Sequence, residues 1–242
     1  MALSYMEGVK TIWKGSNVGS NNIVVRQADL RDLDRIVEVN NRAWGPGLES
    51  TKEDFMERFS TFPEGEIGAY IRGRLVGLIS SLMIKSDSPE DVPPSWAEVT
   101  DNGKIRNSHD SDGNSLVCFS AVVDPEVRGM SIGRLLVNAQ LDLAKRLGLK
   151  RVYAYSRPAS YRYFKRKFYP EFSDEKFLKE VPIERYLALG KDGQPRKEGD
   201  ILFDIAIGMH ISNGARLVRI IPHGRIEDKE AYGYNVLLEY LP

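Results

Sequence analysis

Cysteine is almost absent from this sequence of 242 residues, which contains only Cys118. A single thiol cannot form a disulfide within the chain, so the composition gives no sign of an oxidising compartment. Cys118 lies between Val117 and Phe119 in the most apolar run of the chain. This context favours a buried strand cysteine over a catalytic nucleophile.

An excess of charge of one sign is also absent, because 34 Lys and Arg residues balance 34 Asp and Glu residues. No global field therefore favours nucleic acid or an anionic membrane, and we expect neither as a partner. No apolar run reaches membrane-spanning length, and the N-terminus lacks a secretory core, so we expect a cytoplasmic protein. The three histidines (His109, His210, His223) lack metal-ligand spacing, so no metal is expected.

Hydrophobic residues make up 42% of the chain, and their spacing predicts one mixed α/β domain over 22–242 after a flexible lead-in at 1–21. Two polar or Tyr-rich and Lys-rich stretches, 86–114 and 157–200, read as insertions. The expected strands cover 23–25, 67–71, 75–84, 116–123, 151–155, 215–221 and 232–240. The expected helices cover 30–44, a stretch from about 50, 131–147 and 201–212, and further helical turns are expected within 157–200.

Two local features refine these expectations. In the helix from about 50, a capping box at Thr51 is expected, and Phe55, Met56 and Phe59 are expected on the inward side. The stretch 86–114 is rich in Pro, Gly, Asp and Ser, which predicts a long loop. Loops of this length inside a domain are usually functional or disordered, and we favour a substrate lid.

The segment from Val122 to Leu136 carries the strongest functional signal. A buried strand runs into a tight turn containing Gly129 and then into an amphipathic helix. Such a turn directs several backbone N–H groups at one point, and the helix dipole adds positive charge, which suits a phosphate. Arg128 and Arg134 can add charge-assisted bonds. The alternative is a plain connection whose glycines merely permit a turn. Rossmann and Walker A loops are excluded, because their glycine and lysine patterns are missing.

The stretch Arg128-Gly129-Met130-Ser131-Ile132-Gly133, after a Val-Asp-Pro strand end, resembles the coenzyme A motif of GNAT N-acetyltransferases, Arg/Gln-x-x-Gly-x-Gly/Ala. Ser131 stands where that family usually has Gly, and a positive φ there would cost about 1 kcal/mol. The resemblance covers roughly 22–242. The chain is most similar to the larger GNAT domains, some of which are fused to nitrilase-type hydrolases, although no hydrolase segment is seen in this chain.

The resemblance implies the GNAT fold: a central, mostly antiparallel mixed sheet of about seven strands flanked by helices. It also implies acetyl-CoA as co-substrate, held in an opening between the strands at 116–123 and 151–155. The pantetheine arm would bond the backbone of Val122 and Val123. The pyrophosphate would lie on the amides of Arg128, Gly129, Met130, Ser131, Ile132, Gly133 and Arg134. A primary amine would then attack the thioester directly.

Many GNAT enzymes supply the general acid from a tyrosine in a Tyr-x-x-x-Gly-Phe segment, and two alignments are open. Tyr163 matches in spacing, but Lys167 replaces the glycine. His210 takes the tyrosine's place in the second alignment, which we prefer because Gly214 and a closing strand pair follow. A histidine can donate a proton near neutral pH. The alternative roles are a helix-face histidine bonded to a carbonyl and a packing or rim tyrosine.

The base and the acceptor site are less specific. Glu98, His109 and Asp112 are candidate bases, and a water chain is equally open. The candidate substrate-binding residues are Trp44, Trp96, Thr100 and His109, although either tryptophan could be a core residue.

Two classes of function follow from these residues. The first is an N-acetyltransferase acting on a primary amine of a small molecule, or less readily of a protein. The second is a catalytically silent sensor that binds acyl-CoA, which Ser131 and the missing tyrosine at position 210 keep open. A homodimer through the closing strands is also possible.

Overall fold

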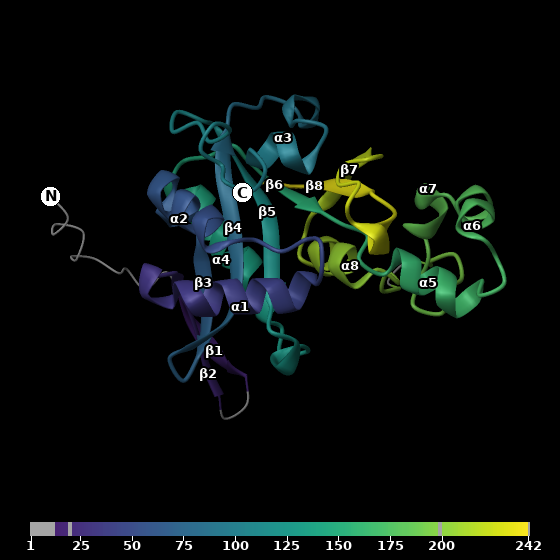
Figure 1. Ribbon diagram of the computed structural model, residues 1–242, viewed down its shortest axis with the longest axis horizontal. Helices are drawn as coiled ribbons and strands as arrows, with labels where there is room; N and C mark the ends of the chain where they lie inside the picture. Colours follow the sequence, from purple (N-terminus) through teal and green to yellow (C-terminus); the bar gives the residue numbers. More distant parts are fainter. Residues whose placement is uncertain (1–12, 19–20, 198–199, 242) are drawn as a thin grey trace, which may run out of the picture. The chain divides into compact units, whose positions relative to one another are not determined.

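The computed structural model describes residues 13–18, 21–197 and 200–241 (Figure 1). They cluster into two compact units, one running to Tyr153 and the other from Ala154 to Tyr240. The prediction of a single domain over 22–242 therefore stays a prediction. Each unit has its own buried side chains and is described by itself.

The first unit is built on a sheet with the strand order β1-β2-β3-β4-β5, in which each strand is antiparallel to its neighbour. The predicted strands and the hairpin between β3 and β4 are confirmed. One further strand, β1, lies inside the predicted lead-in, where polar residues hid its extended pattern. The bounds are Trp13–Val18 for β1, Asn21–Gln27 for β2, Ile67–Ile71 for β3, Arg74–Ile84 for β4 and Ser115–Val123 for β5.

Helices α1 (Leu33–Trp44) and α2 (Lys52–Thr61) follow the first strands as predicted. The carboxylate of Asp29 accepts a hydrogen bond from the N–H of Arg31 and starts a short 3₁₀ turn before α1. At the start of α2, the side chains and amides of Thr51 and Asp54 bond each other in a reciprocal capping box. These caps fix where each helix begins.

The inward face of α2 differs from the prediction at one position. Phe55 and Phe59 are buried, but Met56 is 55% exposed, so its expected inward side was wrong. Arg58 is buried instead. Residues three and four apart share a helix face, whereas the residue next to Phe55 points about 100° away. The buried stripe therefore follows 55, 58 and 59, and the sequence hides it because position 58 is charged.

The segment 86–114 is not a structureless loop. It contains a 3₁₀ turn at Pro89–Asp91 and the short helix α3 (Trp96–Thr100). Val92, Val99 and Ile105 are each no more than 1% exposed, so the segment contributes its own core residues. It is packed structure, and its role as a substrate lid stays a prediction.

Helix α4 (Ile132–Arg146) packs on the face of the sheet opposite α1 (Figure 1). Gly77 of β4 allows this approach, because a Cβ there would lie 3.2 Å from Ile132 and 3.3 Å from Leu136. After α4, strand β6 (Arg151–Ser156) leads the chain into the second unit.

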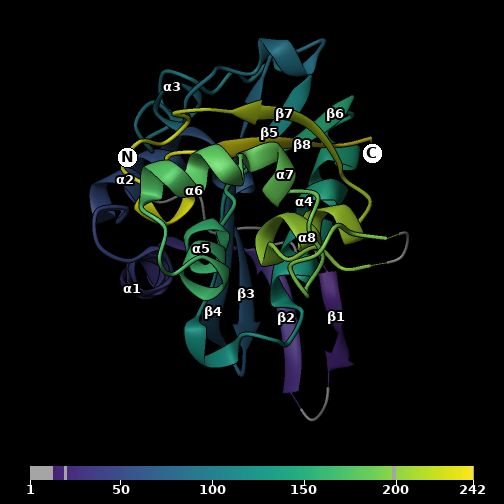
Figure 2. The same ribbon diagram turned by 90° about the vertical axis from the view of Figure 1, so that its right-hand side faces the viewer.

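The second unit combines four helices with a strand pair among its described residues (Figure 2). Tyr161, Phe164, Phe177 and Tyr186 form its aromatic centre, and all are no more than 1% exposed. The bounds are Tyr161–Phe168 for α5, Asp174–Glu180 for α6, Ile183–Tyr186 for α7, Ile205–Ser212 for α8, Arg216–Ile221 for β7 and Asn235–Tyr240 for β8. Strands β7 and β8 are antiparallel. The predicted class, a mixed α/β fold with mostly antiparallel strands, is confirmed.

Truncating the two neighbouring apolar residues of α2 should have very different effects on stability. Phe55→Ala should cost about 3–5 kcal/mol, because it removes a fully buried ring. Met56→Ala is the matched control and should stay within about 0.5 kcal/mol, because Met56 is exposed. Urea unfolding followed by circular dichroism measures both, and equal losses would contradict the described face of α2.

Candidate active site

The loop between β5 and α4 has the backbone conformation that an anion site needs. After a 3₁₀ turn at Pro125–Val127, Gly129 has φ +89° and Ser131 has φ +58° with ψ +18°. The positive φ considered for Ser131 is thus observed. A left-handed conformation costs a serine about 1 kcal/mol relative to glycine. The two left-handed residues turn the chain from the strand into the helix within a few residues.

The N-terminus of α4 lacks a side-chain cap. The first N–H groups of a helix have no acceptor within the helix. Ser131 makes no side-chain cap, and the first turn carries no acidic residue, whereas α2 and α6 have both. A Cβ on Gly129 would meet nothing within 4 Å, so the space beside it is open. Arg128 and Arg134 are exposed on either side. These groups fit a pyrophosphate.

The buried carboxylate of Asp124 fixes the start of this loop. It forms an ion pair with Arg35 of α1, and its Oδ1 lies 3.4 Å from Nη1 of Arg42. Oδ1 also accepts a hydrogen bond from the N–H of Glu126 at 3.2 Å. Arg42 closes the arrangement by donating to Glu126 at 2.9 Å. Sequence reasoning missed this role, because nothing in the sequence tells which arginines face Asp124.

The ionised form of Asp124 is favoured despite its burial. Burial by itself would raise the pKa of this carboxyl, but the hydrogen bond from the Glu126 amide and the contacts of Arg35 and Arg42 outweigh it and lower the pKa. The carboxylate therefore keeps its charge, and with it the tie to α1, throughout the neutral range.

Both candidate tryptophans contact consecutive residues of β5. Nε1 of Trp44, at the end of α1, donates to Oγ of Ser120 at 3.3 Å. Nε1 of Trp96, in α3, donates to the carbonyl oxygen of Phe119 at 3.3 Å. The fold thus brings together two residues that are 52 positions apart in the sequence, a few residues before Val122 and Val123.

Strand β5 has a bulge at this point. Ser80 of β4 pairs with Ser120, and the next residue, Ser81, pairs with Cys118, so Phe119 has no partner in the register. A bulge of this kind turns a strand and redirects its side chains and backbone groups. The indole N–H groups of Trp44 and Trp96 donate hydrogen bonds to the residues of this bulge, Ser120 and Phe119.

Thr100, Glu98 and His109 make contacts inside their own segment or with β4. Thr100 is buried, and its hydroxyl donates to the carbonyl of Trp96. Glu98 is exposed; its N–H donates to the hydroxyl of Ser95, the N-cap residue of α3, and its carboxylate accepts a hydrogen bond from that hydroxyl. Nδ1 of His109 accepts from the N–H of Met83 at 3.1 Å, and burial lowers its pKa. These contacts are structural, and their roles with substrate stay predictions.

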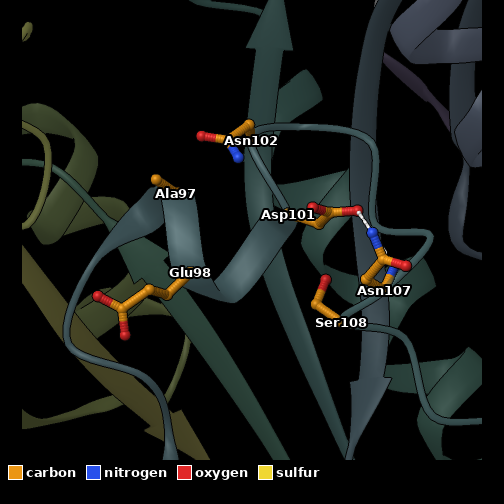
Figure 3. Close-up of a pocket in the computed structure, with 6 residues that line it drawn as sticks. All are labelled: Ala97, Glu98, Asp101, Asn102, Asn107 and Ser108. Atoms are coloured by element: carbon orange, nitrogen blue, oxygen red, sulfur yellow. Dashed lines mark hydrogen bonds between the residues drawn. The ribbon is translucent and has the colours of Figure 1, made fainter.

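A shallow polar pocket lies on this segment (Figure 3). Asp101 faces Asn107 and accepts a hydrogen bond from its side chain at 2.7 Å, whereas the carboxylate of Glu98 points away from this pair. Asp112, the other candidate base on this segment, is exposed and does not line the pocket. The lining residues are Ala97, Glu98, Asp101, Asn102, Asn107 and Ser108.

The two candidate acids, both in the second unit, differ in environment. His210 is 6% exposed, its Nδ1 lies 2.8 Å from the hydroxyl oxygen of Tyr240, and burial lowers its pKa to about 4. Tyr163 is 50% exposed, with its ring centre 6.3 Å from that of Phe203. His210 is therefore a neutral imidazole at pH 7. The contacts of His210 resemble those of the alternative role, a helix-face histidine bonded to a carbonyl, except that its partner is the hydroxyl of Tyr240.

A family model for acetyltransferases of the GNAT family matches residues 33–168, which include β3 to β6 and the loop before α4. The chain belongs to the GNAT family. In the part of this GNAT protein that the structure describes, no helix is long and apolar enough to cross a membrane, and no three His, Cys, Asp or Glu residues are grouped as metal ligands would be.

Two relatives from Bacillus subtilis cover most of this GNAT chain. One, named an uncharacterized N-acetyltransferase (YkwB), is 26% identical over 90% of the chain and 88% of its own length. The other, named a probable hydrolase (YhcX), is 29% identical over 90% of the chain. The chain spans only 38% of the length of that second relative.

Two solved structures share the fold. The loading GNATL domain of CurA from Lyngbya majuscula has a TM-score of 0.71 and 21% identity, over 91% of this chain and 98% of that one. The GNAT-like decarboxylase GphF, in complex with isobutyryl-CoA, has a TM-score of 0.67 and 24% identity, over 90% and 98%. At these identities the similarity establishes the fold, and the GphF structure holds isobutyryl-CoA on it.

Removing the charge of Asp124 should destabilise the first unit in a pH-dependent way. Asp124→Asn should cost about 3 kcal/mol near pH 7, because Arg35 is left without its buried partner. The folded pKa of Asp124 is lowered, so its stabilisation is complete above the unfolded value of about 3.9 and is lost as the pH falls through the folded value. Urea unfolding of both proteins between pH 3 and 7 measures this, and a difference that does not change below pH 4 would contradict it.

Protonation of His210 should destabilise the second unit as the pH falls. The folded pKa is about 4, while an unfolded histidine titrates near 6.5. The stabilisation is therefore complete above pH 6.5 and is lost toward pH 4, by up to about 3 kcal/mol. Hydrogen exchange of α8 in the wild type and in His210→Gln tests this. The two should differ in their pH dependence, and parallel pH profiles would rule the effect out.

Proposed function

We propose that this GNAT chain binds acetyl-CoA at the loop before α4 and transfers the acetyl group to a primary amine of a small molecule. The observation that carries the proposal is the uncapped N-terminus of α4 behind two left-handed residues, Gly129 and Ser131. In a chain of this family, that arrangement supports an acyl-CoA pyrophosphate as its ligand.

The proposed cofactor contacts follow from the loop. The pyrophosphate would accept hydrogen bonds from the amides between Arg128 and Arg134, and the two arginine side chains would add charge. The pantetheine arm would lie along the backbone at Val122 and Val123. Because Asp124 ties the end of β5 to α1, both sets of contacts would belong to one rigid part of the unit.

The proposed reaction is direct attack in a ternary complex. A neutral amine forms the C–N bond, the carbonyl oxygen becomes an oxyanion, and the C–S bond then breaks. The amine loses one proton and the thiolate gains one, so the products are an amide and free coenzyme A. At pH 7, His210 can offer only a neutral N–H, so we propose it as a hydrogen-bond donor, with Tyr163 as the alternative acid. Glu98, His109, Asp112 and a water chain stay the alternative routes for the amine proton.

The alternative function is a silent acyl-CoA-binding module. Two observations favour keeping it: Ser131 carries the strain that glycine would avoid, and His210 is buried against Tyr240. Both functions require the same cofactor loop, and only amine-dependent release of coenzyme A separates them.

Calorimetric binding of acetyl-CoA tests the shared cofactor site. The wild type should bind with micromolar affinity, near −8 kcal/mol. The double variant Arg128→Glu, Gly133→Trp should lose binding at least tenfold, because it places a negative charge and a bulky ring where the pyrophosphate would lie. The matched control, Arg146→Glu with Leu147→Trp, alters the far end of α4 and should bind normally.

Failure of the wild type to bind acetyl-CoA would reject the proposal. Binding without release of free thiol, in the presence of a panel of primary amines, would identify the silent module. Thiol release from malonyl-CoA or acetyl-CoA without any amine would identify a different acyl-CoA reaction on this fold.

A further inference from the structure

The buried guanidinium of Arg58 connects α2 to the segment that carries Trp96. Its Nε donates to the carbonyl oxygen of Gly103 at 2.5 Å, and Nη2 lies 3.2 Å from Oγ of Ser50. Burial lowers the pKa of Arg58, and the buried carboxyl of Glu66 provides a partly compensating field. Keeping a guanidinium at 1% exposure is costly, and its contacts with Gly103 and Ser50 offset part of that cost.

Gly103 is enclosed between Arg58 and Trp96. It has φ +90°, and a Cβ there would lie 3.1 Å from Cη2 of Trp96 and 3.2 Å from Nη2 of Arg58. Its N–H donates to the hydroxyl of Thr100, which in turn donates to the carbonyl of Trp96. Residues 96–103 therefore form one tightly hydrogen-bonded segment, the brace.

The brace ends on the bulge of β5. Nε1 of Trp96 donates to the carbonyl oxygen of Phe119, the residue without a partner in the β4 register. The Phe119 ring lies under the guanidinium of Arg58, whose Cζ is 5.2 Å from the ring centre. Arg58 thus contacts the bulge directly at the ring of Phe119. It is also connected to the bulge indirectly, through Gly103 and Trp96.

We propose that Arg58 and Trp96 are positioning residues for acyl transfer, which fix the bulge at Phe119 and so orient the part of β5 that faces the thioester. This inference rests on the proposed function for its effect on turnover. The bulge lies immediately before the stretch assigned to the pantetheine arm. If the bulge were free to move, the backbone groups of β5 would be misplaced relative to the reacting carbonyl.

The variant Trp96→Phe tests the proposal most directly, because it removes the indole N–H and keeps an aromatic ring. With acetyl-CoA as donor and phenethylamine or spermidine as acceptor, kcat should fall about tenfold. The Kd for acetyl-CoA should stay within about twofold, because the pyrophosphate loop is untouched. Arg58→Lys should lower kcat similarly, and the double variant should lose less than the product of the two, because both act through one brace.

A second readout does not depend on turnover. Amide hydrogen exchange over 116–121 should become faster in Trp96→Phe, because the bulge loses the hydrogen bond that the indole N–H of Trp96 donates to it. Met56→Ala, an exposed change on the same helix as Arg58, is the control and should leave kcat and exchange unchanged.

The outcomes separate this inference from the proposed function. Unchanged exchange and unchanged kcat in folded Trp96→Phe would overturn the positioning role while leaving acyl transfer intact. Absence of turnover in a wild type that still binds acetyl-CoA would overturn both acyl transfer and its positioning residues. Faster exchange with a tenfold lower kcat would support the inference, even if Arg58→Lys fails to fold.

Discussion

The carboxylate of Asp124 is the constraint on which the loop between β5 and α4 depends. It is buried where β5 ends, and two arginines of α1 hold it there. With this point fixed, the left-handed residues that follow must turn the chain directly into α4. The helix then begins without a side-chain cap and beside an open space. A loop that was free at Asp124 would not hold those amides on one point.

Strand β5 is held by other elements along its second half. Trp96 bonds Phe119, Trp44 bonds Ser120, and the arginines of α1 bond Asp124. These contacts come from α3 and from α1, at and after a bulge that interrupts regular pairing with β4. The bulge sacrifices ladder hydrogen bonds, and side-chain donors replace part of what the ladder would supply.

The composition of the segment 86–114 suggests a loop, but its contacts show a packed structure. Its Pro, Gly and Asp content is typical of a mobile loop, yet Val92, Val99 and Ile105 are buried within it. Thr100 and His109, the candidate substrate-binding residues of this segment, bond Trp96 and Met83. Polar side chains in a compact loop must satisfy its backbone, because few regular hydrogen bonds are available there.

The order of most helices and strands, the Arg-x-x-x-x-Gly turn after β5 and the family of the chain could all be predicted from the sequence. These features are local, since periodicity, caps and glycines act within a few residues. Only the tertiary structure decided that Arg35 and Arg42 face Asp124, that Arg58 rather than Met56 is buried, and that His210 lies against Tyr240. Such pairings depend on contacts between residues that are distant in the sequence. The sequence pattern around a buried charged residue does not identify its partner.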